Sequence, residues 1–273
     1  MAYDLYPKIP IKGNVELYDG YDEILKKVES EIDRRGAKVI CIECYPGTFE
    51  KELLENLIKP LQPGLVIHSD EYFLSSEEVT EKIQYILTDD RVFGVMSHHS
   101  LEDFIVQDKF ETYKKLLNGN KEQMVVVYGV GASLITEPDL LLYANLTRWE
   151  IQLRYRSKSI CNWKADNWDE EPLRKVKRGY YFEWRIADKL KKRLFKKIDF
   201  MLDVNKQNHP KMISGLDYLN ALSEVVKRPF RLVPYFDSGV WGGKWMQEKF
   251  KVDPDKVNLA WCFDGVPEEN SLL

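Results

Sequence analysis

The chain has 273 residues, of which 44% are hydrophobic and 31% are charged, and its formal net charge is −4. This length can bury the core of one large domain, alone or with an appendage, and this charge gives no overall attraction to nucleic acid or acidic membranes. The apolar runs are strand-sized, well below the roughly 18 residues that a membrane helix needs, and the N-terminus lacks the pattern of a signal peptide. We therefore expect a soluble, cytoplasmic protein with no membrane partner.

Residues 1–36 are predicted to form a lead-in and one helix. Prolines and glycines interrupt the first twenty residues, which favours irregular or extended structure. Residues 21–35 then place Ile24, Val28 and Ile32 at helical spacing, and a glycine follows as a stop signal.

A strand, a glycine turn and a helix are predicted next. The apolar run at residues 37–42 (AKVICI) has the character of a buried strand, and the helical pattern that follows the turn ends near Pro60. Cys41 and Cys44 form a CxxC motif, but residues three apart on a strand point to opposite faces. The motif therefore favours buried thiols over a zinc or redox site.

A second strand at residues 64–68 leads into a polar segment that contains Asp70. A capping box of Ser75 and Glu78 then predicts the start of a helix that runs through Leu87. An aspartate that follows a strand can act as a general base towards a hydroxyl group or hold a metal-bound water. The alternative is an ordinary solvated carboxylate.

Strands and helices continue to alternate towards the C-terminus. The expected strands are residues 124–128 (MVVVY), 140–144 and 198–204. One helix is expected to begin at Thr147, with Glu150 as the capping partner, and another to span residues 180–195. The glycines at 129 and 131 are half of a dinucleotide-binding fingerprint. This alternation predicts a three-layer α/β domain with a mainly parallel sheet over residues 37–230.

The turn at residues 44–51 stands where open α/β sheets bind their ligands, beyond the carboxyl end of a strand. A phosphate-binding P-loop has the pattern GxxxxGK[ST], and its alignment on this turn places Glu50 at the position of the lysine. Glu50 and Glu52 would also repel a triphosphate at the first turn of the helix.

The turn is therefore a degenerate P-loop (Walker A) motif whose phosphate-binding candidates are Gly47, Thr48 and Lys51. The alternative is that Gly47 only allows a tight turn and that Thr48 caps the helix. No metal site is expected, because the four histidines do not show the spacing of shared ligands.

A basic stretch between Arg174 and Lys197 holds eleven lysines and arginines and two acids. Its aromatic and apolar residues recur at helical spacing, so we expect an amphipathic helix with a basic outer face. That face is either solvated surface or, together with Arg148, Arg154 and Arg156, a wall that binds phosphate. The aromatic residues have the spacing of a core face, which argues against nucleic acid as a partner.

Residues 37–205 resemble the uridine kinase and phosphoribulokinase branch of the P-loop kinases. The resemblance rests on the strand–turn–helix unit, on the segment SDEYF at residues 69–73, on the strand VVVYGVGAS and on LLYANLTRWEIQLRYR. It implies that Asp70 would be the base that activates the substrate hydroxyl. It also implies phosphate contacts from Arg148, Arg154 or Arg156, with ATP and Mg²⁺ as cofactors of an active kinase.

Residues 231–273 resemble a different family. The segment PYFDSGVWGGKWMQEKF is similar to the opening segment of class I mannose-6-phosphate isomerases. The whole chain then looks like the N-terminal region of long members of that family, ending in a short, truncated cupin-like tail. In these isomerases zinc lies in a cupin barrel further along, and no histidine follows His209 in this chain.

Three functions remain open from the sequence. The first is a kinase-like, non-catalytic module of an isomerase-related protein of sugar-phosphate metabolism, which binds a phosphorylated ligand and pairs with the isomerase domain or with a second copy. The second is an active ATP-dependent kinase for a nucleoside or a sugar. The third is mannose-6-phosphate isomerase activity in a longer parent chain.

Overall fold

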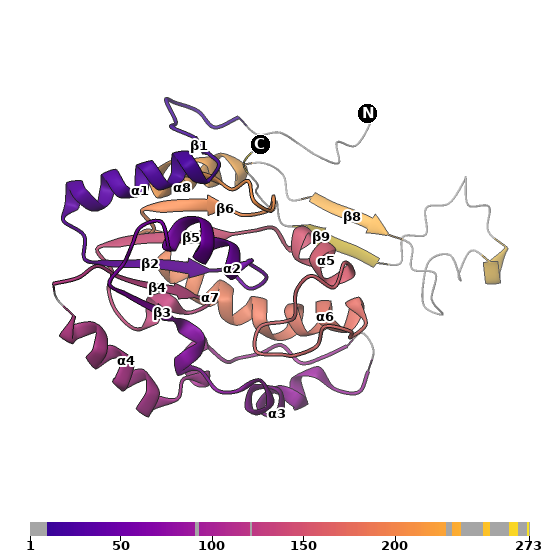
Figure 1. The fold of residues 1–273 in the computed structure, drawn as a ribbon. Coiled ribbons are helices and arrows are strands. Elements are labelled where there is room, and N and C mark those ends of the chain that lie inside the picture. The colour runs from indigo at the N-terminus through magenta and orange to yellow at the C-terminus, as the bar shows by residue number, and fades with distance from the viewer. Residues whose placement is uncertain are drawn as a thin grey trace. The chain divides into compact units, whose positions relative to one another are not determined.

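The computed structural model describes residues 10–90, 93–120, 122–227, 231–235, 248–251, 262–266 and 272 (Figure 1). Contacts between residues divide the chain into two units, and the larger one comprises Pro10–Ala221 with Ser271–Leu273. Most of the second unit follows Leu222 in the sequence, and its described strands β8 (Arg231–Tyr235) and β9 (Cys262–Val266) pair antiparallel. Residues 231–273 are predicted to be an isomerase-like segment, and most of them lie outside the described residues.

The larger unit alternates strands and helices along the chain. Its strands are β1 (Tyr18–Asp19), β2 (Val39–Cys44), β3 (Leu65–His68), β4 (Val125–Gly129), β5 (Leu140–Asn145), β6 (Phe200–Asp203) and β7 (Lys211–Ser214). Its helices are α1 (Tyr21–Arg35), α2 (Glu50–Leu53), α3 (Ser76–Leu87), α4 (Gln107–Gly119), α5 (Arg148–Arg156), α6 (Pro172–Arg178), α7 (Trp184–Leu194) and α8 (Gly215–Val225), which runs past Ala221. A π-helical turn continues α2 through residues 54–58, and another joins α6 to α7 at residues 179–183.

Among the described residues, seven strands form one sheet in the order β1-β7-β6-β5-β2-β4-β3. The strands β3, β4, β2, β5 and β6 are parallel, and β7 runs antiparallel to both of its neighbours, β6 and β1. The adjacent interior strands β4, β2 and β5 are buried almost throughout, as expected for parallel strands with helices on both faces. The predicted α/β class with a mainly parallel sheet is therefore confirmed.

Helices cover both faces of this sheet. Right-handed crossovers place α1 and α2 on one face, and α3 and the helical segment α6–α7 on the other. Two side-chain contacts agree with this arrangement, because the Tyr21 hydroxyl of α1 donates to Glu52 of α2 (2.8 Å) and Arg178 of α6 contacts Thr80 of α3 (3.3 Å).

The chain changes direction at the carboxyl ends of β2 and β5. From β2 it crosses towards β3, whereas from the adjacent β5 it crosses the opposite way to β6. A ligand crevice in an open α/β sheet lies at such a switch point. The turn after β2 and the start of α5 therefore meet at the expected ligand-binding position. We call the carboxyl-end edge of β3, β4, β2 and β5 the strand-end rim.

Local signals in the sequence predicted several element ends correctly. The first helix spans Tyr21–Arg35 and stops at Gly36, whose φ of 62° is left-handed. Ser75 and Glu78 form the capping box of α3, and the Thr147 hydroxyl accepts from the Glu150 N–H at the start of α5.

Other element predictions were wrong or incomplete. The helix expected at residues 180–195 starts earlier, at Pro172, and contains the π-helical turn. The elements α4, β7 and α8 were not predicted, and the lead-in contributes the short edge strand β1. Thr48 does not cap a helix: its hydroxyl donates to the Tyr45 carbonyl (2.7 Å), and α2 has Phe49 at its N-cap without a side-chain cap.

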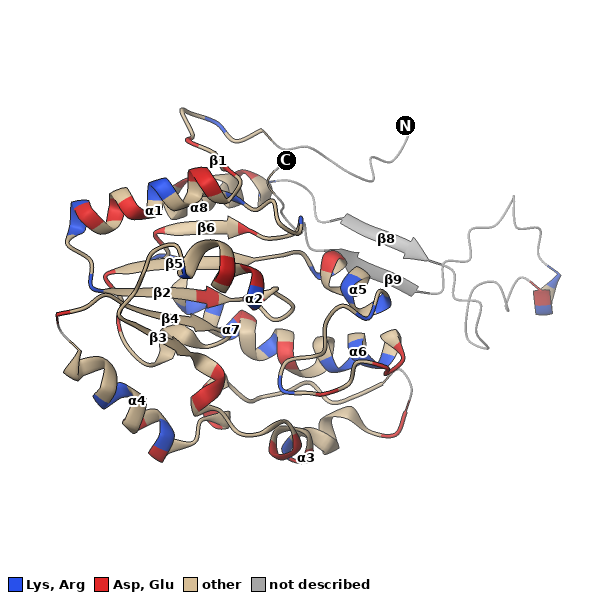
Figure 2. Ribbon diagram, viewed as in Figure 1, with Lys and Arg blue, Asp and Glu red and all other residues tan. Residues whose placement is uncertain are grey.

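The basic stretch is less exposed than its composition predicted. The ribbon of α6 carries blue segments in Figure 2, which mark lysine and arginine, but Lys175, Lys177 and Arg178 are buried. The Lys175 ammonium donates to the Ile160 (3.1 Å) and Trp168 (2.9 Å) carbonyls. Lys175 and Arg178 thus support the long connection before α6, and the Lys177 ammonium donates to the Asp90 carbonyl after α3, so these three residues are not a solvated face.

The predicted apolar face of α7 is confirmed. Trp184, Ala187, Leu190 and Leu194 are all buried. Within the described part of the chain, no helix is long and apolar enough to cross a membrane.

Candidate functional site

The turn after β2 is tightly packed. Gly47 has a φ of 97°, and a Cβ atom at this position would lie 3.0 Å from Cγ1 of Ile151. Both the backbone conformation and the space therefore require glycine here. Lys51 lies on α2 with its side chain exposed. The structure thus brings Gly47 against α5, while Lys51 faces solvent.

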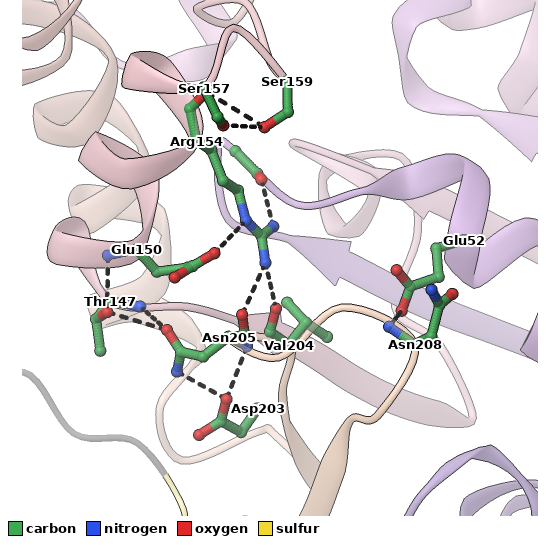
Figure 3. A network of polar contacts seen from close by, with 11 residues as sticks. Glu52, Thr147, Glu150, Arg154, Ser157, Ser159, Asp203, Val204, Asn205 and Asn208 are labelled. Atoms are coloured by element: carbon green, nitrogen blue, oxygen red, sulfur yellow. Dashed lines mark hydrogen bonds and ion pairs between the residues drawn. The ribbon is translucent and has the colours of Figure 1, made fainter.

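Arg154 clamps this turn from α5. Its side chain is 3% exposed, and its guanidinium donates to the Gly47 carbonyl (2.9 Å) and to the Glu150 carboxylate (2.9 Å). It also donates to the carbonyls of Val204 (2.7 Å) and Asn205 (3.1 Å), as Figure 3 shows. The Arg154 fork is therefore occupied by protein acceptors that tie the turn to the end of β6.

Neighbouring polar residues extend this clamp (Figure 3). The side-chain oxygen of Asn205 accepts from the backbone (2.9 Å) and the hydroxyl (3.0 Å) of Thr147, and the Asn205 amide donates to Asp203 (2.7 Å). The start of α5 is thereby fixed to the end of β6.

The carboxylates of α2 face inward to protein partners. Glu50 contacts Nε2 of His68 at the end of β3 (2.6 Å). Glu52 accepts from Tyr21 and from the Asn208 N–H (2.9 Å). Burial lowers the pKa of His68, but the hydrogen bond and charge of Glu50 outweigh burial and leave the pKa raised. The Glu50–His68 pair thus joins the turn after β2 to the end of β3.

A buried carboxylate occupies the glycine loop after β4. Glu43, at the end of β2, accepts from the backbone N–H groups of Gly131 (2.6 Å) and Ser133 (2.8 Å). Burial raises the pKa of Glu43 to about 7. Successive N–H groups in such a loop form a concave anion-binding site. In this protein the carboxyl group of Glu43 accepts from these N–H groups, so the loop at Gly129-Val130-Gly131 has no free N–H at Gly131 or Ser133 for an external anion.

The two other candidate arginines of α5 have different surroundings. Arg148 is half-buried, and its guanidinium contacts Asp188 (2.5 Å), which also accepts from the Tyr45 hydroxyl (2.9 Å). Arg156 is exposed at the far end of the helix, over the ring of Trp149. Arg148 and Arg154 therefore lie beside the turn after β2, whereas Arg156 stacks on the outer surface of α5.

Asp70 lies at the end of β3 in a short 3₁₀ turn and is paired with a lysine. Its carboxylate, 48% exposed, is 3.2 Å from the ammonium of Lys164, whose side chain is only 9% exposed. The same ammonium donates to the Asp70 carbonyl (3.3 Å). Two contacts thus fix the lysine amine against one residue of the rim.

Lys164 occupies an unusual backbone position. It is the third residue of the turn Asn162–Ala165, closed by the Ala165 N–H to the Asn162 carbonyl (3.2 Å), and its φ is 50°. This region is uncommon for residues other than glycine and costs about 1–3 kcal/mol. A partly exposed ion pair contributes only about 0.2–1 kcal/mol. The ion pair with Asp70 therefore does not offset the strain.

Buried polar groups hold this turn in place from below. Glu183 is fully buried and accepts from the Asn162 amide (2.6 Å), from the Trp163 N–H (2.6 Å) and from the Tyr155 hydroxyl. Burial raises the pKa of Glu183. Arg178, also buried, donates to the Lys164 carbonyl (2.9 Å). The turn is therefore a rigid support for Lys164.

Metal ligands are not gathered at the rim. No cluster of three or more histidine, cysteine or acidic side chains that could hold a metal ion occurs among the described residues. Cys41 and Cys44 are free and buried in β2.

Several residues of this site carry no strong signal in the sequence. Glu43, His68, Lys164 and Glu183 lack a motif, and only the topology brings them to the rim. A charged residue inside or directly after an apolar strand run was the one available hint, and it applies to Glu43 and His68. Lys164 and Glu183 lie outside such runs.

Fold and site together define an α/β domain with an internally hydrogen-bonded cluster of polar residues at its strand-end rim. The chain belongs to the family described as domain of unknown function (DUF8485), which matches residues 20–227. No curated protein matches the chain.

Proposed function

We propose that this domain is a kinase-like module without phosphotransfer activity. It binds a phosphorylated small molecule at the strand-end rim and serves as a regulatory or scaffolding part of a cytoplasmic protein of sugar-phosphate metabolism. The observation that carries the proposal is the commitment of Arg154 to Gly47, Glu150, Val204 and Asn205. Because these acceptors use its N–H donors, Arg154 stabilises the turn and does not have those donors available for a nucleotide phosphate.

Three further features support a loss of nucleotide binding. Glu50 stands at the position of the P-loop lysine and is held there by His68. Glu43 occupies the N–H groups of the loop after β4. The carboxylate of Asp188 compensates the positive charge of Arg148. The charges at the rim therefore favour a ligand with a small anionic group over a triphosphate with its metal ion.

Titration calorimetry with Mg-ATP tests the proposal. The native chain is expected to bind with a dissociation constant weaker than about 1 mM, which corresponds to about −4 kcal/mol. Glu50→Ala removes one repulsive carboxylate and is expected to tighten binding by less than about tenfold, since such a charge contributes about 0.3–1 kcal/mol. Glu55→Ala, on the exposed side of the same helical segment, is the matched control. Micromolar binding by the native chain would contradict the proposal.

The second candidate is an active small-molecule kinase that uses ATP and Mg²⁺ with Asp70 as the base. It is favoured by the position of Asp70, whose half-exposed carboxylate lies beyond the carboxyl end of β3. The Mg-ATP titration separates the two candidates, because a kinase requires the nucleotide to bind.

The third candidate is mannose-6-phosphate isomerase activity, which we assign to a longer parent chain carrying the zinc-binding barrel. These 273 residues are then expected to give no turnover of fructose 6-phosphate in a coupled assay, with or without added zinc. Zinc-dependent turnover by this chain alone would disprove that assignment.

A further inference from the structure

Five large apolar side chains are exposed near the end of α3, and we call them the apolar patch. Phe93 is 71% exposed, and Tyr85, Val95, Met96 and Tyr180 are between 40% and 59% exposed. Since an aromatic side chain has about 150–250 Å² of surface, these fractions amount to about 500 Å². The largest apolar patch of a typical monomer measures about 300–600 Å² and is often functional.

Hydrogen bonds fix the connection that carries the middle of this patch. The Val95 N–H donates to the Ile86 carbonyl at the end of α3 (2.8 Å), and the Ser97 N–H donates to the Tyr181 carbonyl before α7 (2.9 Å). A Cβ atom on Gly94 would lie 2.7 Å from the Ile86 carbonyl oxygen and 3.0 Å from the Tyr181 ring. The connection is therefore packed between α3 and the segment before α7, so the patch is one continuous surface.

The apolar patch has the composition of an interface between proteins. The cores of such interfaces are enriched in tyrosine, phenylalanine, methionine and arginine and depleted of lysine and acidic residues. Here the guanidinium of Arg185 lies over the Tyr180 ring, 4.9 Å from its centroid, and donates to the Tyr180 carbonyl (3.1 Å). Tyrosine and arginine are also the residues that most often dominate binding energy.

Charges of opposite sign lie on the two sides of the patch. On α3, Glu81 is exposed one turn before Tyr85 and shares its side of the helix. On α7, Arg185 borders the patch at Tyr180, and the exposed Lys189 follows one turn further along. A two-fold axis through the patch would bring the acidic side of one copy against the basic side of the other.

The remaining charges of these two helices are directed elsewhere. Lys82, the single basic residue of α3, donates to a carbonyl of a neighbouring turn and lies over the ring of Phe104. Asp188, the single acidic residue of α7, pairs with Arg148 at the strand-end rim. The two sides of the patch therefore keep their opposite signs.

We propose that the apolar patch binds a second copy of this chain about a two-fold axis. Phe93 and Tyr85 lie at the centre of the interface, and Glu81 of each copy faces Arg185 of the other. An interface of standard size buries about 800 Å² on each partner, so the patch supplies more than half of that area and the charged borders supply the rest. Such an interface uses the same surface on both copies, which requires the complementarity described above. This pairing goes beyond the proposed function and does not depend on its ligand.

Sedimentation equilibrium of the full chain tests the pairing. The native chain is expected to form dimers with a dissociation constant below about 10 µM. Phe93→Glu and Tyr85→Glu are each expected to weaken the dimer at least about 30-fold, because each places a carboxylate in the core of the interface. Leu216→Glu is the matched control, since Leu216 of α8 is 69% exposed, and it is expected to leave the dimer unchanged.

Circular dichroism shows whether the variants keep the fold. Both side chains are largely exposed, so the spectra and melting curves of unassociated protein are expected to match those of the native chain. Phe93 follows α3 and Tyr85 lies within it. Either variant therefore tests the interface if the other disturbs its local structure.

A charge exchange tests whether the occupant is a second copy. In a symmetric dimer Glu81→Arg or Arg185→Glu places like charges opposite each other twice, so each variant is expected to weaken association about tenfold. A mixture of the two variants forms dimers in which both pairs are attractive again, and its association is expected to return to the native level. A mixture that associates no better than either variant alone would contradict the two-fold pairing.

Two further results would overturn the inference. A native chain that stays monomeric at about 100 µM would show that the patch does not bind a second copy, and a different protein would then be its partner. A native dimer that is weakened neither by Phe93→Glu nor by Tyr85→Glu would show that the copies meet through another surface.

Discussion

Arg154→Met is expected to lower the free energy of unfolding by about 3–5 kcal/mol, the range for removal of one partner from a buried charged network. The substitution leaves the carbonyls of Gly47, Val204 and Asn205 without their donor, and it leaves Glu150 without its partner on the helix. Each buried group left unpaired costs about 1–3 kcal/mol. Urea unfolding followed by circular dichroism measures the loss.

Two variants make this test specific. Arg154→Lys keeps the charge but loses the planar fork, so most of the destabilisation is expected to remain. Arg156→Met, two residues along the same helix, removes an exposed guanidinium over Trp149 and is expected to change stability by no more than about 0.5 kcal/mol. If Arg154→Met and Arg156→Met lowered the free energy of unfolding equally, Arg154 would not be the residue that holds the turn after β2.

Glu43→Gln is expected to change how stability depends on pH. Burial raises the pKa of Glu43 from its ordinary 4.5 to about 7, so the folded state holds this proton more tightly than the unfolded chain does. The contribution to stability is fully present below about pH 4.5 and is lost as the pH rises through about 7. The full loss is about 3 kcal/mol.

The measurement compares unfolding free energies of the native chain and the variant between pH 5 and pH 8. The stability of the native chain is expected to fall over this range more steeply than that of Glu43→Gln, so the difference moves in favour of the variant by about 2–3 kcal/mol. Glu183 and Asp203 also have raised pKa values and contribute to both curves. Glu55→Gln, which removes an exposed carboxylate, is the control. Parallel curves for the native chain and Glu43→Gln would show that Glu43 does not titrate here.

The elements that were predicted correctly are those whose cause is local. The helix Tyr21–Arg35 has an apolar stripe and a glycine stop, and the capping boxes use side chains three residues apart. The strand β7 was missed because it is short and lies near the sheet edge, and the helix that starts at Pro172 was misjudged because Lys175, Lys177 and Arg178 looked like solvent-facing residues. A long basic side chain can be buried when carbonyls of a distant segment accept its hydrogen bonds.

Sequence order alone placed Gly47, Thr48 and Asp70 at the rim, because parallel strands bring their carboxyl ends to one edge. The tertiary structure alone decided what each of them does there. Arg154 and Arg156 are the same residue type two positions apart on α5, and one is buried as a clamp while the other stacks on the surface.

The amino-acid sequence by itself therefore determined the α/β class, the order of its main elements and the edge where the polar residues gather, since periodicity, caps and strand direction are local properties. Only the tertiary structure decided which charges are already compensated, namely Glu50 by His68, Arg154 by backbone carbonyls and Asp70 by Lys164. The physical reason is that hydrogen bonds and ion pairs depend on distances of a few ångströms between segments far apart in the chain, and spacing along the sequence does not encode those distances.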